Sequence, residues 1–156
     1  MKSRWKPMLA ALAIPLLFGG LGALLAGGMG DFEQLKKPPL TPPGWVFPLV
    51  WTLLYLAMGW ASGRVYHIRH PVQVRRRALK LYAVQLVMNA LWPLLFFRLG
   101  LYWVSALWLA ILTLLVIMTA RAFGKLDDLA GILLVPYAAW CLFALYLNIG
   151  VAALNA

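Results

Sequence analysis

Apolar residues along this chain gather into five long stretches that short polar connections separate. A helix that crosses a bilayer needs about 20 mostly apolar residues, and each of these stretches is of about that length. The pattern therefore predicts an all-α protein, an integral membrane bundle of five transmembrane helices that forms a single domain over residues 1–156. The predicted spans lie near residues 7–29, 46–66, 79–97, 102–123 and 129–151.

Composition supports a membrane protein, because 64% of the residues are hydrophobic and only 12% are charged. The net charge of +10 is distributed unevenly along the chain. The start of the chain and the second and fourth connections hold 11 of the 14 Lys and Arg residues, on one side of the predicted bundle. Only Lys36, Lys37 and Arg98 fall on the other side. Cytoplasmic flanks are rich in Lys and Arg, so this multi-pass protein is predicted to have a cytoplasmic N-terminus.

The basic cluster has a second interpretation, which is nucleic-acid binding. Anionic lipid head groups account for the same cluster, so we expect the lipid membrane and no nucleic acid as the partner. The N-terminal residues 2–18 resemble a secretory signal, but the apolar stretch continues to Met29, which favours a retained span. His67 and His70 are three residues apart with no Cys, Asp or Glu nearby, so we predict no metal site.

The connection at residues 30–45 combines prolines with apolar side chains. Its run Pro38-Pro39-Leu40-Thr41-Pro42-Pro43 favours an extended, semi-rigid backbone. A segment with this many apolar groups is not expected to float in water. We therefore predict that it folds as a lid over the outer mouth of the bundle. The predicted lid residues are Phe32, Leu35, Pro42 and Pro43.

Three of the predicted helices carry aromatic and polar side chains on one face, because residues three, four and seven apart share a helical face. An unpaired polar group in hydrocarbon costs several kcal/mol, so these side chains should face one another or a ligand. Any single group could simply bond a neighbouring helix. The three faces together, beneath a proline-rich lid, favour a pocket. They consist of Trp51 and Tyr55; Gln85, Asn89 and Trp92; and Tyr137, Trp140, Cys141, Ala144 and Asn148.

Small residues form a second pattern in the first two spans. Gly59 and Gly63 are four apart, and Gly19, Ala23 and Gly27 repeat that spacing. Such residues let helix backbones approach closely in lipid. From the sequence, this pattern fits packing within one chain and packing between two chains equally well.

The aromatic and polar motifs also carry a family resemblance. Pro-Pro-x-Trp-Val-Phe-Pro-x-x-Trp-Thr-x-x-Tyr (42–55), Gln-Leu-x-x-Asn-x-x-Trp (85–92) and Pro-Tyr-x-x-Trp (136–140) occur in that order. They resemble the tryptophan-rich sensory protein and translocator protein family, which includes the peripheral-type benzodiazepine receptor. The resemblance covers nearly the whole chain. It implies a five-helix bundle, usually a homodimer, that binds porphyrins such as protoporphyrin IX and haem without a required cofactor.

Carried over position by position, the resemblance makes ligand-binding residues of Trp51, Tyr55, Asn89, Trp92, Tyr137 and Trp140, and the shared face adds Cys141. It also implies a photochemical role for Trp51 and Trp140. The sterol pattern of animal relatives is absent, because no cation follows Tyr146, which disfavours cholesterol.

Three functions follow as hypotheses. A receptor or sensor that affects porphyrin traffic or breakdown is the first, and a transporter of small hydrophobic molecules such as sterols or tetrapyrroles is the second. The third is a porphyrin-photodegrading enzyme. The chain offers no Ser-His-Asp set and no intramembrane carboxylate for acid–base work, which favours a binding protein over an enzyme.

Overall fold

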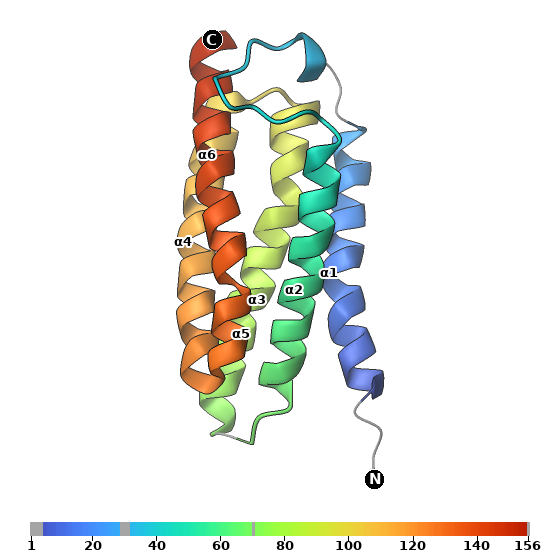
Figure 1. Ribbon diagram of the computed structural model, residues 1–156, viewed down its shortest axis with the longest axis vertical. Coiled ribbons are helices and arrows are strands. Elements are labelled where there is room, and N and C mark those ends of the chain that lie inside the picture. The colour runs from blue at the N-terminus through green and yellow to red at the C-terminus, as the bar shows by residue number, and fades with distance from the viewer. Residues whose placement is uncertain (1–4, 29–31, 70, 156) are drawn as a thin grey trace.

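The structure is a computed structural model that describes residues 5–28, 32–69 and 71–155. Within these residues the chain is a bundle of helices without a strand, as Figure 1 shows. Five helical segments are long and apolar enough to cross a membrane, which confirms the predicted integral membrane bundle. The elements are α1 (Trp5–Ala26), η1 (Phe32–Gln34), α2 (Val46–Tyr66), α3 (Val72–Pro93), η2 (Leu94–Arg98), α4 (Tyr102–Leu126), α5 (Asp128–Leu133) and α6 (Val135–Asn155).

Several helices extend beyond the apolar stretches that predicted them. The third predicted span, residues 79–97, begins at Val72 instead, so the basic run at residues 75–77 lies on α3 and not in a loop. Hydropathy marks the part of a helix that suits lipid, whereas backbone hydrogen bonding continues into the polar flank. The fifth predicted span, residues 129–151, continues to Asn155. The first helix ends at Ala26, where Gly27 takes a φ of 69° and stops the helix.

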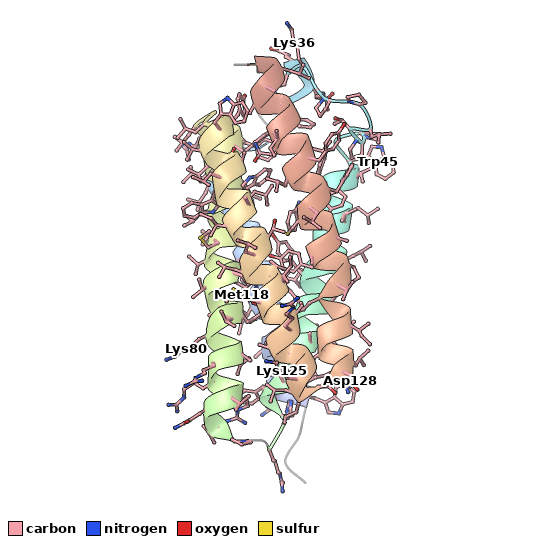
Figure 2. All side chains as sticks on the ribbon, turned by 90° about the vertical axis from the view of Figure 1, so that its left-hand side faces the viewer. Lys36, Trp45, Lys80, Met118, Lys125 and Asp128 are labelled. Carbon is pink, nitrogen blue, oxygen red and sulfur yellow. The ribbon has the colours of Figure 1, made fainter. Side chains whose placement is uncertain are left out.

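Two ends of the bundle differ in character. The lid and the C-terminus lie at one end, and the N-terminus and the α2–α3 connection lie at the other (Figure 1). Lys80 and Lys125 lie at the end opposite to Lys36 (Figure 2). The connections predicted to be rich in Lys and Arg and the lid connection therefore lie at opposite ends of the bundle (Figures 1 and 2). Residues 1–4, in the basic flank before the first span, and residues 29–31, at the end of that span and the start of the lid, lie outside the described residues. His70, one of the two histidines considered for a metal site, lies outside them as well.

The lid is held along the C-terminal helix by several contacts. Asn155 accepts a hydrogen bond from the Lys36 backbone N–H at 3.1 Å and donates one to the Lys36 carbonyl at 2.8 Å. The Tyr146 hydroxyl donates to the Pro39 carbonyl at 2.8 Å. Pro38 packs directly on Gly150, where an added Cβ would meet the proline ring. The lid is thus anchored on α6 through its residues 36–39.

The small residues of α2 pack against α1 of the same chain. A Cβ added at Gly59 would lie 2.8 Å from the Ala11 carbonyl oxygen and 2.9 Å from the Leu12 Cα. A Cβ at Gly63 would meet the side chain of Met8 at 2.5 Å. Gly59 and Gly63 therefore bring two helices of one chain together, which answers the question that the sequence left open for these two residues.

Substituting Gly59 with valine should destabilise the bundle, because the new side chain meets backbone atoms that cannot move aside alone. Forcing extra methyl groups into a packed contact costs about 1–3 kcal/mol. We expect a lower apparent Tm in detergent, measured by circular dichroism. Gly20→Val is the matched control, because nothing lies within 4 Å of a Cβ at Gly20. Equal losses of Tm in both variants would contradict the packing role.

An ion pair ties α2 to the α4–α5 connection at the basic end. Arg64 Nε and Nη2 donate to the Asp127 carboxylate at 2.6 and 3.2 Å. Asp127 also caps α5, because its carboxylate accepts a hydrogen bond from the Ala130 backbone N–H at 3.2 Å. The hydrogen bond from Arg64 lowers the pKa of Asp127 below its usual value.

This ion pair predicts a small acid-sensitive part of the stability. The pKa of Asp127 is lower in the folded chain than in the unfolded chain. The stabilisation is therefore present above the unfolded pKa and is lost as the pH falls through the folded pKa. Both side chains are partly solvated, so the contribution is about 0.5–1 kcal/mol. Asp127→Asn should lower the Tm at pH 7 and narrow its gap to the wild type below pH 4, whereas a constant gap would argue against the pair.

Candidate ligand pocket

A cavity of about 490 Å³ lies in the half of the bundle beneath the lid. Small-molecule sites in proteins commonly have volumes of about 300–1,000 Å³. Four helices, the π-helix η2 and the lid contribute its walls. The lining residues are Leu16, Gly19, Gly20, Ala23, Ala26 and Gly28; Phe32 and Thr41; Phe47, Pro48, Trp51, Thr52 and Tyr55; Asn89, Trp92, Pro93, Phe96 and Phe97; and Trp140, Ala144, Leu147, Asn148 and Val151.

One wall of the cavity is an aromatic cluster from α2 and α6. The Trp51 ring is stacked on the Tyr55 ring with centroids 5.7 Å apart. It meets the Trp140 ring edge-on at 6.4 Å, with the two planes at 90°. Phe47 packs edge-on against the other side of Trp140 at 6.0 Å. Residues 47, 51 and 55 share a face of α2, which explains why one helix supplies three of these rings.

A second wall comes from the end of α3, where Pro93 precedes the π-helix η2. The wider turn brings two consecutive phenylalanines to the cavity, and short π-helical segments often occur at functional sites. The Trp92 ring is stacked on Phe96 at 5.0 Å. Phe32 of the lid closes the top of the cavity through edge contacts with Phe47 at 5.6 Å and Phe97 at 6.0 Å.

A chain of hydrogen bonds runs from the cavity floor into the core. The Tyr55 hydroxyl donates to Asn89 Oδ1 at 3.0 Å, and Asn89 Nδ2 donates to the Tyr137 hydroxyl at 2.6 Å. Tyr137 in turn donates to Gln85 Oε1 at 2.6 Å, and Gln85 Nε2 donates to the Tyr82 carbonyl at 2.9 Å. The polar stripes that the sequence predicted on α2, α3 and α6 therefore face one another, as the cost of unpaired groups in lipid requires.

A second polar link holds the upper part of the cavity. Trp92 Nε1 donates to Asn148 Oδ1 at 3.0 Å, and Asn148 Nδ2 donates to the Tyr102 carbonyl at 3.0 Å. Trp140 Nε1 is buried and has no hydrogen-bond partner within the described residues. None of the described lining residues carries a charge. The cavity therefore suits an uncharged, aromatic or apolar body.

The structure brings most of the predicted site residues together around this cavity. Trp51, Tyr55, Asn89, Trp92 and Trp140 all line it. By contrast, Tyr137 and Cys141 are fully buried behind that surface. Tyr137 contacts two lining residues, through its hydrogen bond to Asn89 and its edge-on contact with the Trp51 ring at 6.1 Å. Whether any of these residues binds a ligand stays a prediction.

The four predicted lid residues differ in their position relative to the cavity. Phe32 lines the cavity, whereas Leu35, Pro42 and Pro43 do not, and Thr41 takes part instead. Sequence reasoning also missed the wall that α1 supplies. Gly19, Gly20 and Ala23 have no functional side chains, so only their shared helical face could have indicated this role.

These features define a class of protein, an integral membrane helical bundle with an aromatic internal cavity under a lid. The model of the TspO/MBR family matches residues 11–154, and the chain belongs to that family. The chain is 36% identical over 137 residues to protein CrtK of Rhodobacter capsulatus, with 88% of this chain and 85% of that protein covered.

Two further relatives are similar over most of the chain. The tryptophan-rich sensory protein of Cereibacter sphaeroides is 40% identical over 124 residues, with coverage of 80% of this chain and 76% of that protein. The translocator protein of Bos taurus is 35% identical over 147 residues, with 92% and 87% covered. The family model's match at residues 11–154 includes the three helices with aromatic and polar faces, so the family assignment extends over the cavity.

Proposed function

We propose that this protein is a membrane receptor that binds porphyrins, such as protoporphyrin IX and haem, and similar flat apolar molecules in the cavity. Through that binding it would affect their traffic or their light-dependent breakdown. The observation that carries the proposal is the uncharged cavity of about 490 Å³ between the Trp51–Trp140 cluster and the Trp92–Phe96 stack. Relatives named tryptophan-rich sensory protein and translocator protein support a sensing or translocating role.

The chemistry of the cavity favours recognition by shape and stacking. Indole rings offer flat apolar surfaces to a tetrapyrrole, and Asn89 and Tyr55 at the floor can orient a polar edge. Porphyrin carboxylates need a cation or water. Lys37 is a candidate, because its ammonium lies 4.6 Å from the Phe32 ring centroid, one side chain outside the cavity. No required cofactor or metal is part of this proposal.

Light-dependent porphyrin breakdown is the second candidate function. The edge-on contact of the Trp51 and Trp140 rings at 6.4 Å favours it, because both indoles would touch a ligand that absorbs light. Transport of small hydrophobic molecules is the remaining alternative. It predicts net movement of ligand across the bilayer, which a receptor need not produce.

The orientation and assembly belong to the same proposal. Arg76, Arg77 and Lys80 lie in the first half of α3, and Figure 2 shows Lys80 at the end opposite to Lys36. This clustering of basic residues supports a cytoplasmic N-terminus. Family membership supports a homodimer. Reporter fusions at each terminus and the mass of the detergent-solubilised protein test these two points.

Titration of the purified protein with protoporphyrin IX tests the function. We expect saturable quenching of tryptophan fluorescence in the dark, and loss of porphyrin absorbance under light if the second candidate is right. Vesicles that contain the protein then show whether bound porphyrin crosses the bilayer. Quenching that rises without saturation would contradict the receptor, and net flux would favour the transporter.

A further inference from the structure

Several residues that line the cavity are also exposed on the outside of the bundle. Five of them lie on α1 and α2, the sixth, Gly28, follows the end of α1, and none belongs to the lid. A residue that both borders a cavity and is exposed marks an opening of that cavity. Because the first five lie within two membrane-spanning helices, the opening between these helices faces the bilayer and not the water above the lid. These five residues are Leu16, Gly20 and Ala23 of α1 and Pro48 and Thr52 of α2.

The packing of α1 against α2 explains the opening. At the basic end, Gly59 and Gly63 of α2 lie directly against α1. Toward the lid, the last such contact is between Gly19 and the Tyr55 ring. Thr52 lies seven residues before Gly59, on the same helical face, yet it is exposed. The two helices therefore pack closely at one end and separate beneath the lid.

The α1 side of the opening is formed by Leu16 and two small residues. Nothing lies within 4 Å of a Cβ built on Gly20, and Ala23 follows on the same face. The α2 side offers one hydroxyl, and Thr52 donates it to the Pro48 carbonyl of its own helix at 2.7 Å. The edges of the opening thus present apolar groups and the Thr52 hydroxyl, which is already hydrogen-bonded within its own helix. Such groups can face the hydrocarbon of the bilayer without an unpaired polar atom.

The other route to the cavity, beneath the lid, is closed by more contacts. Asn155 and Tyr146 together hold the lid backbone to α6 with three hydrogen bonds. Phe32 covers the cavity from above through its contacts with Phe47 and Phe97. Within the described residues, no side-chain hydrogen bond joins α1 to α2. Parting the two helices further therefore breaks fewer polar contacts than lifting the lid.

We propose that the opening between α1 and α2 is a lateral portal through which molecules dissolved in the bilayer enter and leave the cavity while the lid stays in place. The proposal rests on the ligand-binding function above and narrows it to ligands that partition into the membrane. Apolar planar molecules with low solubility in water have this property. The lid then prevents the bound molecule from escaping into water.

Exchange kinetics test the portal with the full chain reconstituted in lipid vesicles. Protoporphyrin IX is the first probe and pyrene, an uncharged flat hydrocarbon, is the second. Stopped-flow fluorescence follows transfer of each probe from protein-free vesicles. In Gly20→Phe, association and dissociation rate constants should both fall about tenfold, so that Kd changes much less than either rate. Ala23→Phe narrows the same opening from the next turn and should act in the same direction.

Two controls separate the portal from other causes. Leu24→Phe adds the same ring to an exposed position of α1 that does not line the cavity, and should leave both rates unchanged. Asn155→Ala combined with Tyr146→Phe removes the hydrogen bonds that hold the lid. Unchanged exchange rates in this double variant support the portal. Faster exchange in it, with normal rates in the α1 variants, would show entry beneath the lid and overturn the proposal.

The two probes distinguish failure of the portal from failure of the proposed function. If pyrene binds saturably and protoporphyrin IX does not, the porphyrin function fails and the pyrene rates decide the portal. If both bind but the Gly20→Phe and Ala23→Phe rates equal those of the wild type, the portal alone is wrong. Absence of saturable binding for both probes would overturn both proposals.

Discussion

Replacing Trp51 and Trp140 together with leucine should weaken binding of protoporphyrin IX by about 10-fold to 100-fold, because each aromatic stacking contact contributes about 0.5–1.5 kcal/mol beyond the area it buries. The two rings meet edge-on at 6.4 Å, so they present flat surfaces to the cavity from two helices. Leucine keeps the wall apolar and removes the aromatic surface. The measurement is an equilibrium titration followed by porphyrin absorbance, which does not depend on the protein's own fluorescence.

Trp5→Leu combined with Trp103→Leu is the matched control. Both side chains are exposed, by 73% and 55%, and neither lines the cavity. This variant should bind porphyrin with wild-type affinity. If it loses as much affinity as the Trp51 and Trp140 variant, porphyrin associates with surface tryptophans, and the cavity is not the binding site. Light-dependent loss of porphyrin should follow the affinity in both variants if the photochemical candidate is correct.

Much of the fold could be predicted from the sequence because lipid imposes simple constraints. A crossing helix needs a long apolar stretch, and the chain has five. Helix ends were less predictable, since the backbone of α3 stays helical through a basic flank that hydropathy assigns to a loop. The break at Leu134 between α5 and α6 and the π-helix after Pro93 have no hydropathy signal, because they change backbone hydrogen bonding and not side-chain polarity.

The sequence could predict those site residues that have an aromatic or polar side chain and lie on the same helical face as other such residues. This reasoning placed Trp51, Tyr55 and Asn89 together, and all three line the cavity. It could not separate the cavity surface from the layer behind it, because a hydrogen-bonded tyrosine such as Tyr137 belongs to the same stripe. It also missed Gly20. A glycine has no side chain to suggest a role, and it contributes to the cavity by leaving space that a larger side chain would fill.

Asn89→Leu should destabilise the bundle more than any other single change at the cavity floor. The amide accepts from Tyr55 and donates to Tyr137, so leucine, which has a similar volume, leaves the Tyr55 hydroxyl without its acceptor. Losing hydrogen bonds at a buried polar group costs about 1–3 kcal/mol. The apparent Tm in detergent should fall by about 5 °C or more, as expected for a chain of this length. Ligand affinity should fall as well, because the floor loses its polar group.

A double-mutant cycle tests whether this loss comes from the hydrogen-bond chain. Asn89→Leu and Tyr55→Phe remove opposite ends of the same bond, so the double variant should be less destabilised than the sum of the two single changes. Tyr146→Phe with Asn89→Leu supplies the additive comparison, because Tyr146 bonds the lid on another helix. Additive losses in both cycles would mean that Asn89 stabilises the bundle through packing alone. Coupling confined to the first cycle would instead make the floor of the cavity a cooperative polar unit that fixes α2, α3 and α6 around the cavity.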